Sequence, residues 1–191
     1  MTVNEILADV VARLDSLGVS YAVGGSLSSS VWGQARQTND IDIAIDLAAS
    51  VSRAFVQAFG DPYYVSDEEI AEALSSSETY RMVQLMHMEE AFKIDLFLLR
   101  NGVYERSELE RARLVQIGPG LSVRVSAPEN IVLAKLRWYV AGNRISDRQW
   151  NDIVQVLEVQ AGHLDDAYLD HWAAHFGVRE LLDEVRSQAL P

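Results

Sequence analysis

The chain has 191 residues, of which 49% are hydrophobic, and it carries a formal net charge of -12 at pH 7. This length and composition suffice for the core of one domain or of two small ones. The sequence contains no cysteine, which excludes disulfides, thiolate metal sites and cysteine nucleophiles. No apolar run reaches membrane-spanning length, and the first residues lack the basic-then-apolar pattern of a secretory signal. We therefore expect a cytoplasmic protein with no membrane partner.

The acidic excess is unevenly distributed along the chain. Between Arg100 and Arg148 nine basic residues stand against five acidic ones, so this segment carries +4, whereas the rest of the chain carries -16. The overall acidity opposes indiscriminate binding to nucleic acid, because phosphate backbones are bound by excess Lys and Arg. The central segment is either a surface for a polyanionic substrate or a set of scattered, solvated arginines.

Helical and strand-like patterns alternate over the first two thirds of the sequence. Hydrophobic periodicity and turn residues predict the following elements, in chain order: a helix over 4–17, a strand over 21–23, a short helix over 26–36, a strand over 40–47, helices over 50–59 and 66–74, a hairpin of 79–87 with 91–99, a helix over 104–113 and a hairpin over 114–125.

After Pro128 every segment has helical periodicity. We expect four helices, over 129–140, 146–159, 164–176 and 178–190. The predicted fold is therefore of the α+β class, with a mixed sheet and flanking helices in residues 1–126 and a helical bundle in residues 127–191.

Chemistry-bearing residues gather between positions 24 and 46 and again at Asp95. Gly24, Gly25 and Ser26 follow a strand and open a short helix, whose first N–H groups favour phosphate. Asp40 and Asp42 stand two apart on the polar side of an alternating strand, where both can reach one ion. Asp95 is a lone acid in an otherwise apolar strand. Taken singly, these features also fit a turn and a solvated strand face; together they favour a metal site, since clustered acids repel unless a cation is bound.

The stretch from Gly24 to Asp42 resembles the signature of the nucleotidyltransferase superfamily related to DNA polymerase beta. That signature is a strand, Gly-Gly or Gly-Ser, a spacer of roughly ten residues and Asp-apolar-Asp on the next strand. The segment APENIVLAKLRWYVAGNRISDRQWNDIVQVLEVQ, residues 127–160, resembles the helical C-terminal part of toxin-like and uncharacterised bacterial nucleotidyltransferases of the AbiEii type.

The resemblance implies an assignment for each motif. The turn of residues 24–26 would bind a nucleoside triphosphate such as ATP, through backbone N–H groups and the Ser26 hydroxyl. Asp40 and Asp42 would bind Mg²⁺, and Asp95 would hold a second, catalytic Mg²⁺ ion and help to deprotonate the acceptor hydroxyl.

Three further residues have alternative assignments. Lys135 corresponds to a lysine of the family's helical motif, and it would either contact phosphate or be a helix-surface lysine. Arg36 would either contact phosphate or be a solvated arginine at the end of a helix. Asp152 corresponds to an acid of the next family motif.

The implied activity is transfer of a nucleoside monophosphate to a hydroxyl group, with release of pyrophosphate. The acceptor would be a transfer RNA end, a protein side chain or a small molecule, and the protein would be a candidate toxin with an antitoxin partner. The alternative is a non-catalytic member of the same fold that binds a nucleotide or a protein partner.

Overall fold

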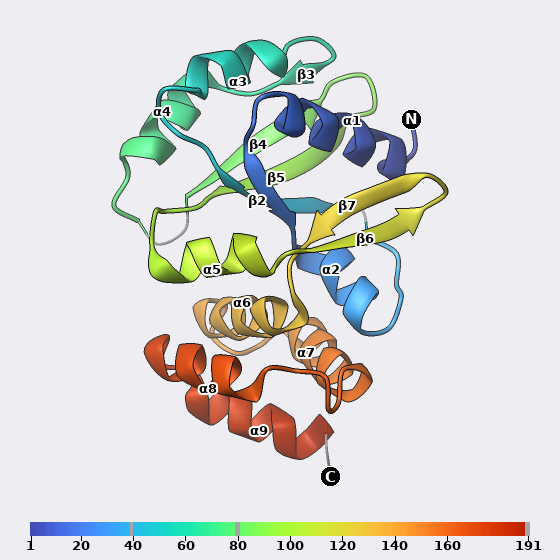
Figure 1. Ribbon diagram of the computed structural model, residues 1–191, viewed down its shortest axis with the longest axis vertical. Helices are drawn as coiled ribbons and strands as arrows, with labels where there is room; N and C mark the ends of the chain where they lie inside the picture. Colours follow the sequence, from blue (N-terminus) through green and yellow to red (C-terminus); the bar gives the residue numbers. More distant parts are fainter. Residues whose placement is uncertain (39, 79–80, 190–191) are drawn as a thin grey trace. The chain divides into compact units, whose positions relative to one another are not determined.

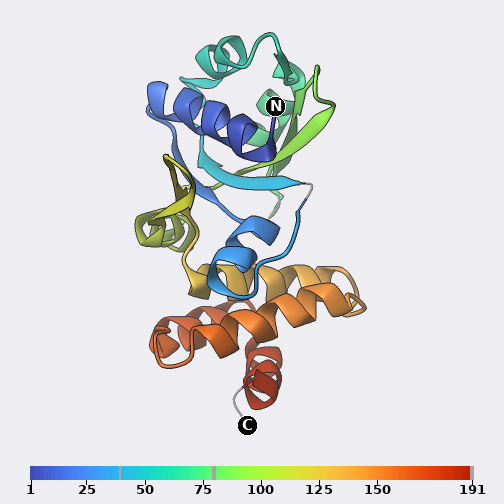
Figure 2. The same ribbon diagram turned by 90° about the vertical axis from the view of Figure 1, so that its right-hand side faces the viewer.

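The computed structural model describes residues 1–38, 40–78 and 81–189 (Figures 1 and 2). The chain forms two compact units. Unit 1 consists of residues 1–24 and 38–125, and unit 2 consists of residues 25–37 and 126–191. The domain boundary expected from the sequence places residues 25–37 in the first domain, whereas the structure groups this segment with the C-terminal helices.

Unit 1 is built on one mixed β-sheet. Over the described residues its strands follow the order β3-β4-β5-β2-β1-β7-β6. The strands are β1 Ser20–Val23, β2 Ile41–Asp46, β3 Tyr63–Tyr64, β4 Met82–His87, β5 Phe92–Leu98, β6 Arg113–Gly118 and β7 Leu121–Val125. Both predicted hairpins are present, since β4 pairs with β5 and β6 pairs with β7, each in antiparallel fashion.

The alternating sequence of β2 determines how this strand lies in the sheet. Ile41, Ile43 and Ile45 are fully buried, while Asp42 is partly exposed and Asp46 is exposed. Because successive side chains of a strand point to opposite faces, the isoleucines fix the register against the core and leave the acids on the other face. β2 runs antiparallel to β1 and parallel to β5.

Unit 1 has four helices in its described residues, of which the first and the third begin at a capping side chain. They are α1 Val3–Ser16, α3 Ser52–Ala58, α4 Asp67–Ser75 and α5 Val103–Arg111. Thr2 and Glu5 form a capping box at the start of α1, whose apolar stripe is buried. α4 also has a capping side chain, because the Ser66 hydroxyl accepts a hydrogen bond from the N–H of Glu69.

Unit 2 is helical throughout its described residues. It consists of α2 Gly25–Trp32, α6 Pro128–Ala141, α7 Asp147–Val159, α8 Asp166–His175 and α9 Arg179–Ala189. Its core is made of aliphatic side chains with no exposed surface, among them Leu133, Leu136, Ile153, Val156, Leu169 and Leu182. The predicted helical bundle is confirmed, with α2 as an additional member that comes from the N-terminal part of the sequence.

The helix expected over 26–36 ends earlier, at Trp32. Gly33 follows it, and a Cβ atom at this position would lie 2.9 Å from the carbonyl oxygen of Ser29 and 3.3 Å from the backbone nitrogen of Val156. Such distances leave no room for a side chain, so glycine allows α2 to end in close contact with α7.

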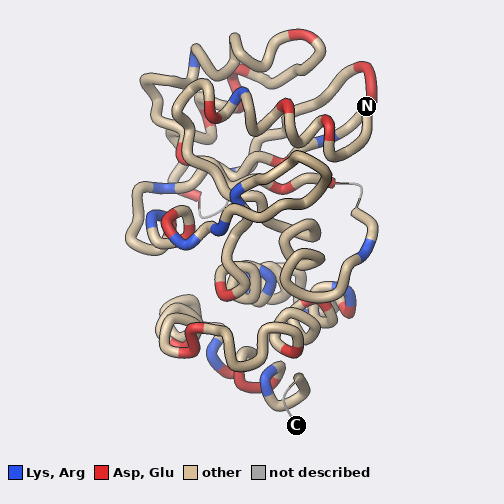
Figure 3. Tube along the Cα trace, turned by 45° about the vertical axis from the view of Figure 1, so that its right-hand side comes forward, with Lys and Arg blue, Asp and Glu red and all other residues tan. Residues whose placement is uncertain are grey.

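The basic segment identified in the sequence is not one surface of either unit. Its first part lies in unit 1 and its second part in unit 2. α5 carries both acidic and basic residues (Figure 3), namely Glu105, Arg106, Glu108, Glu110 and Arg111. Within the described part of the chain, no helix combines the length and apolar character that crossing a bilayer requires.

Candidate functional site

The acidic residues of unit 1 are brought together by strand pairing. Asp42 in β2 lies directly opposite Asp95 in β5, in a parallel register that runs from Ile41–Ile94 to Ile45–Leu98. Paired residues of neighbouring strands are roughly 4.8 Å apart and point to the same face. Asp40 immediately precedes β2, two residues before Asp42. We call the group of Asp40, Asp42, Asp95 and Lys93 the acidic cluster.

Asp95 is largely buried and only half satisfied. Its Oδ2 accepts a hydrogen bond of 2.8 Å from Nζ of Lys93, and its side chain is 14% exposed. Its Oδ1 is buried and has no hydrogen-bond partner among the described residues. A buried carboxylate oxygen without a donor is costly, and a bound cation is one way in which proteins satisfy it.

Lys93 interacts with the whole acidic cluster. The hydrogen bond to Asp95 raises the pKa of Lys93 above its ordinary value. Partial burial lowers the pKa, and the negative charges of Asp95, Asp40 and Asp42 raise it further. Lys93 lies two residues before Asp95 on β5, so the two side chains share a strand face, and no function is assigned to this lysine from the sequence.

Asp40 is held by Thr38, a residue to which no function is assigned from the sequence. The Thr38 hydroxyl bonds the Asp40 carboxylate oxygen Oδ1, and it lies 3.2 Å from the Asp40 carbonyl oxygen. A threonine two residues before an aspartate is a common turn arrangement, so the sequence contained no signal that distinguished this one.

The carboxylates satisfy part of what a divalent metal ion requires. Mg²⁺ binds carboxylate oxygens, usually one or two from the protein. Asp42 and Asp95 supply two carboxylates in register, and the unbonded Oδ1 of Asp95 fits a cation. Within residues 1–38, 40–78 and 81–189, no group of three or more His, Asp or Glu side chains is already arranged to hold an ion, so the assignment of Asp40, Asp42 and Asp95 as metal ligands stays a prediction.

The glycine turn that precedes α2 is more constrained than the sequence suggested. The N–H of Gly24 donates a 2.8 Å hydrogen bond to the carbonyl oxygen of Asp42, which extends the pairing of β1 with β2. Gly24 therefore does not offer its N–H to a phosphate, contrary to the expectation from the sequence. Gly25 has a φ of 56°, a left-handed conformation that favours glycine. Gly25 and Ser26 begin α2, and the first N–H groups of a helix have no acceptor within the helix itself.

A second ionic group lies in unit 2, and we call it the mixed cluster. Asp152 of α7 is buried, and its two carboxylate oxygens accept hydrogen bonds of 3.1 and 2.9 Å from Nε and Nη2 of Arg36. Nζ of Lys135, from α6, lies 2.8 Å from Oδ2 of the same carboxylate. Nη2 of Arg36 also donates a 2.6 Å hydrogen bond to the Ser26 hydroxyl oxygen. The mixed cluster thus joins the start of α2 to α6 and α7.

This geometry corrects the sequence-based alternatives for two residues. Arg36 is not a solvated arginine, since its side chain is 25% exposed and bidentately bound. Lys135 is not a surface lysine, since it is buried and paired. Burial by itself would raise the pKa of Asp152, but the hydrogen bonds from Arg36 and Lys135 outweigh it, and the pKa lies below its ordinary value.

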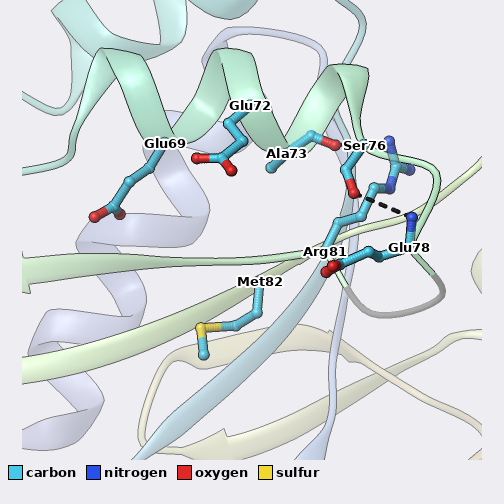
Figure 4. Close-up of a pocket in the computed structure, with 7 residues that line it drawn as sticks. All are labelled: Glu69, Glu72, Ala73, Ser76, Glu78, Arg81 and Met82. Atoms are coloured by element: carbon cyan, nitrogen blue, oxygen red, sulfur yellow. Dashed lines mark hydrogen bonds between the residues drawn. The ribbon is translucent and has the colours of Figure 1, made fainter.

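Unit 1 also has a pocket that lies outside the acidic cluster. Its lining includes Glu69 and Glu72 of α4 together with Glu78 and Arg81 (Figure 4). None of the residues predicted from the sequence lines this pocket.

No protein-family model matches the sequence, and no curated protein matches it. Solved structures do match. The antibiotic-resistance factor ANT(2'')-Ia in solution superposes with a TM-score of 0.57 at 12% identity, and the alignment covers 97% of this chain and 96% of that chain. A crystal structure of the same factor in complex with adenylyl-2''-tobramycin gives a TM-score of 0.58 at 14% identity, over 94% of this chain and 99% of that one.

Two further structures resemble the chain less closely. The lincosamide antibiotic adenylyltransferase LnuA, bound to lincomycin, has a TM-score of 0.51 at 15% identity, over 83% of this chain and 98% of that chain. A nucleotidyltransferase-like protein from Paracoccidioides brasiliensis has a TM-score of 0.51 at 16% identity, and the alignment covers 95% of this chain and 91% of that chain. The chain therefore has the nucleotidyltransferase fold, as the resemblance implied. None of these matches tests the resemblance to the AbiEii type, which stays a prediction.

Proposed function

We propose that this protein is a Mg²⁺-dependent nucleotidyltransferase that transfers a nucleoside monophosphate from a triphosphate such as ATP to an acceptor hydroxyl. The observation that supports this most directly is the register of Asp42 opposite Asp95 on neighbouring parallel strands, in a chain with the nucleotidyltransferase fold. Two carboxylates at strand distance on one face, with Asp40 two residues away, form an acidic surface suited to a hard cation.

The acidic cluster would hold the metal and move a proton. Asp40 and Asp42 would bind Mg²⁺, and Asp42 and Asp95 would share a second ion; the ions, when bound, neutralise charge on the phosphate oxygens. Asp95 would accept the proton of the acceptor hydroxyl while the oxygen of that hydroxyl forms a bond to the α-phosphorus. The bond from that phosphorus to the bridging oxygen breaks, and pyrophosphate leaves with the electron pair.

The start of α2 would bind phosphate. Gly25 and Ser26 would donate backbone N–H groups and Ser26 its hydroxyl, while the helix dipole favours negative charge at this end. Arg36 bonds Ser26 directly and would either orient its hydroxyl or contact phosphate itself. Lys135 would affect phosphate binding only indirectly, because it bonds Asp152, and Asp152 in turn accepts hydrogen bonds from Arg36.

For the acceptor, we propose a cationic, hydroxyl-bearing small molecule as the first class to test. The net charge of -12 favours a positively charged acceptor over RNA, and structural neighbours are described with tobramycin and lincomycin. Transfer RNA and protein are the other two acceptor classes to be compared in the test described below. A toxin role with an antitoxin partner would follow only if one of these is modified and growth stops on expression.

The test is release of pyrophosphate from each of the four NTPs, with Mg²⁺ and each acceptor class, by the wild-type protein and by Asp42→Asn. We expect activity to fall by about 10³-fold in Asp42→Asn, because loss of one preorganised charge at a reacting phosphate has about this effect. Asp46→Asn is the matched control: it lies on the same strand, is exposed, and should keep wild-type activity.

The alternative function is a non-catalytic protein that binds a nucleotide or a partner. Equal pyrophosphate release by wild type and Asp42→Asn, at the level of a blank without protein, would favour it. A rise in melting temperature with Mg²⁺-ATP under those conditions would then identify nucleotide binding without turnover.

A further inference from the structure

Lys93 has an unusual position for a positively charged residue. It lies two residues before Asp95 on β5, so both side chains project from the same face of the strand. Its Nζ atom is 2.8 Å from Oδ2 of Asp95, on the carboxylate that the proposed function assigns to a metal ion. An ammonium group therefore occupies one oxygen of that carboxylate in this structure.

The charge of the acidic cluster is only partly balanced by this lysine. Its three carboxylates and one ammonium leave a net charge of -2, and Lys93 is influenced by all three carboxylates. Carboxylates at strand distance repel one another, and Lys93 reduces this repulsion without removing it. The cluster thus retains the charge that one divalent cation would balance.

The two partners of the ion pair differ in their freedom to move. The Asp95 side chain is 14% exposed, whereas that of Lys93 is 42% exposed. Lysine has a long, flexible side chain whose ammonium group can turn toward solvent. Asp95 is held by the buried strand around it, so Lys93 can leave once another cation compensates the charge of this largely buried carboxylate.

We propose that Lys93 is an internal counter-cation, which binds Asp95 in the metal-free protein and is displaced when a divalent ion binds this carboxylate. The proposal rests on the proposed function, since it needs the acidic cluster to bind a metal. Lys93 is then a positioning residue. It keeps the Asp95 carboxylate on the open face before the ion arrives, and it weakens the affinity for that ion by competing with it.

The sequence makes this displacement directly measurable, because the chain has only two lysines, Lys93 and Lys135. The rate at which an amine-acylating reagent labels each lysine is measured by mass spectrometry, with and without Mg²⁺ and without nucleotide. We expect Mg²⁺ to raise the labelling rate of Lys93 several-fold, because the ammonium loses its carboxylate partner. Lys135 is the built-in control: it is buried against Asp152 and its rate should not change.

A second measurement compares Mg²⁺ affinity in three variants by calorimetry, after circular dichroism has shown that each is folded. Lys93→Met removes the competitor, and we expect it to bind Mg²⁺ about tenfold more tightly than wild type. Lys93→Arg keeps the charge and should stay within about threefold of wild type. Arg53→Met removes an exposed positive charge on α3 and controls for net charge alone.

The outcomes separate this proposal from the proposed function. If Mg²⁺ binds with equal affinity to wild type and Lys93→Met, or leaves Lys93 labelling unchanged, the displacement is overturned while metal binding stands. If Arg53→Met gains as much affinity as Lys93→Met, the effect is general electrostatics and the proposal also fails. If no variant binds Mg²⁺, both this proposal and the metal dependence of the proposed function are overturned.

Discussion

The two ionic clusters of the molecule use the same kinds of side chain in opposite proportions. The acidic cluster of unit 1 has three carboxylates and one ammonium, and one buried carboxylate oxygen of Asp95 lacks a partner among the described residues. The mixed cluster of unit 2 has one carboxylate, Asp152, and two cations, and both oxygens of that carboxylate are bonded.

This difference distinguishes a group that stabilises the fold from a group that is prepared for a ligand. A buried carboxylate that accepts hydrogen bonds from Arg and Lys is complete, and it holds together the elements that supply the donors. Carboxylates in excess destabilise the protein that contains them and are relieved by a cation. The same substitution, aspartate to asparagine, should therefore have opposite effects on stability in the two clusters.

The largest effect on stability is expected from Asp152→Asn. The substitution leaves Arg36 and Lys135 without their carboxylate, and breaking a buried ion pair in this way costs about 3 kcal/mol of unfolding free energy. Urea denaturation measures the loss. Asp147→Asn, an exposed position at the start of the same helix, should cost about 0.5 kcal/mol. Equal small losses in both variants would show that the mixed cluster is not a stabilising element.

The pH dependence of stability gives a smaller and more specific difference. The pKa of Asp152 is lower in the folded protein than its ordinary value of 3.8. Its contribution is therefore complete above the ordinary pKa and is lost as the pH falls through the lower, folded pKa. The difference in unfolding free energy between wild type and Asp152→Asn should be constant from pH 7 to about 5 and shrink below about pH 4. A difference that first shrinks between pH 7 and 5 would assign the effect to another group.

The smallest effect, of opposite sign, is expected from Asp42→Asn in the absence of metal. Removing one of three neighbouring negative charges relieves repulsion, so we expect the unfolding free energy to rise by up to about 1 kcal/mol. Urea denaturation in the presence of a chelator measures this change. A loss of stability comparable to that of Asp152→Asn would mean that the acidic cluster is also a structural element.

Much of the fold could be predicted because local signals agreed with one another. The isoleucines of β2 fixed its buried face, Ser66 marked the start of α4, and the glycine-containing turns separated the hairpins and helices. The pairing of β2 with β5, which places Asp42 and Asp95 in register, has no local signal in either strand. Short β3 was missed because two residues carry no periodicity.

The remaining features depend on contacts between residues far apart in the sequence. The pairing of Arg36 with Asp152 spans 116 positions, so no local pattern indicated that Arg36 would be bound. The N–H of Gly24 is bonded because β1 lies beside β2, which a turn motif does not reveal. The position of Lys93 on the Asp95 carboxylate depends on a side-chain conformation, which periodicity does not specify.

The central claim is that Asp42 and Asp95 bind the same divalent cation. The most direct measurement is a crystal structure of the protein grown with Mn²⁺ and a non-hydrolysable NTP, with anomalous scattering used to locate the metal. The account predicts an anomalous peak within about 2.2 Å of carboxylate oxygens from both residues, with the Lys93 ammonium moved away from Asp95. Metal bound elsewhere, while Lys93 stays on Asp95, would contradict it.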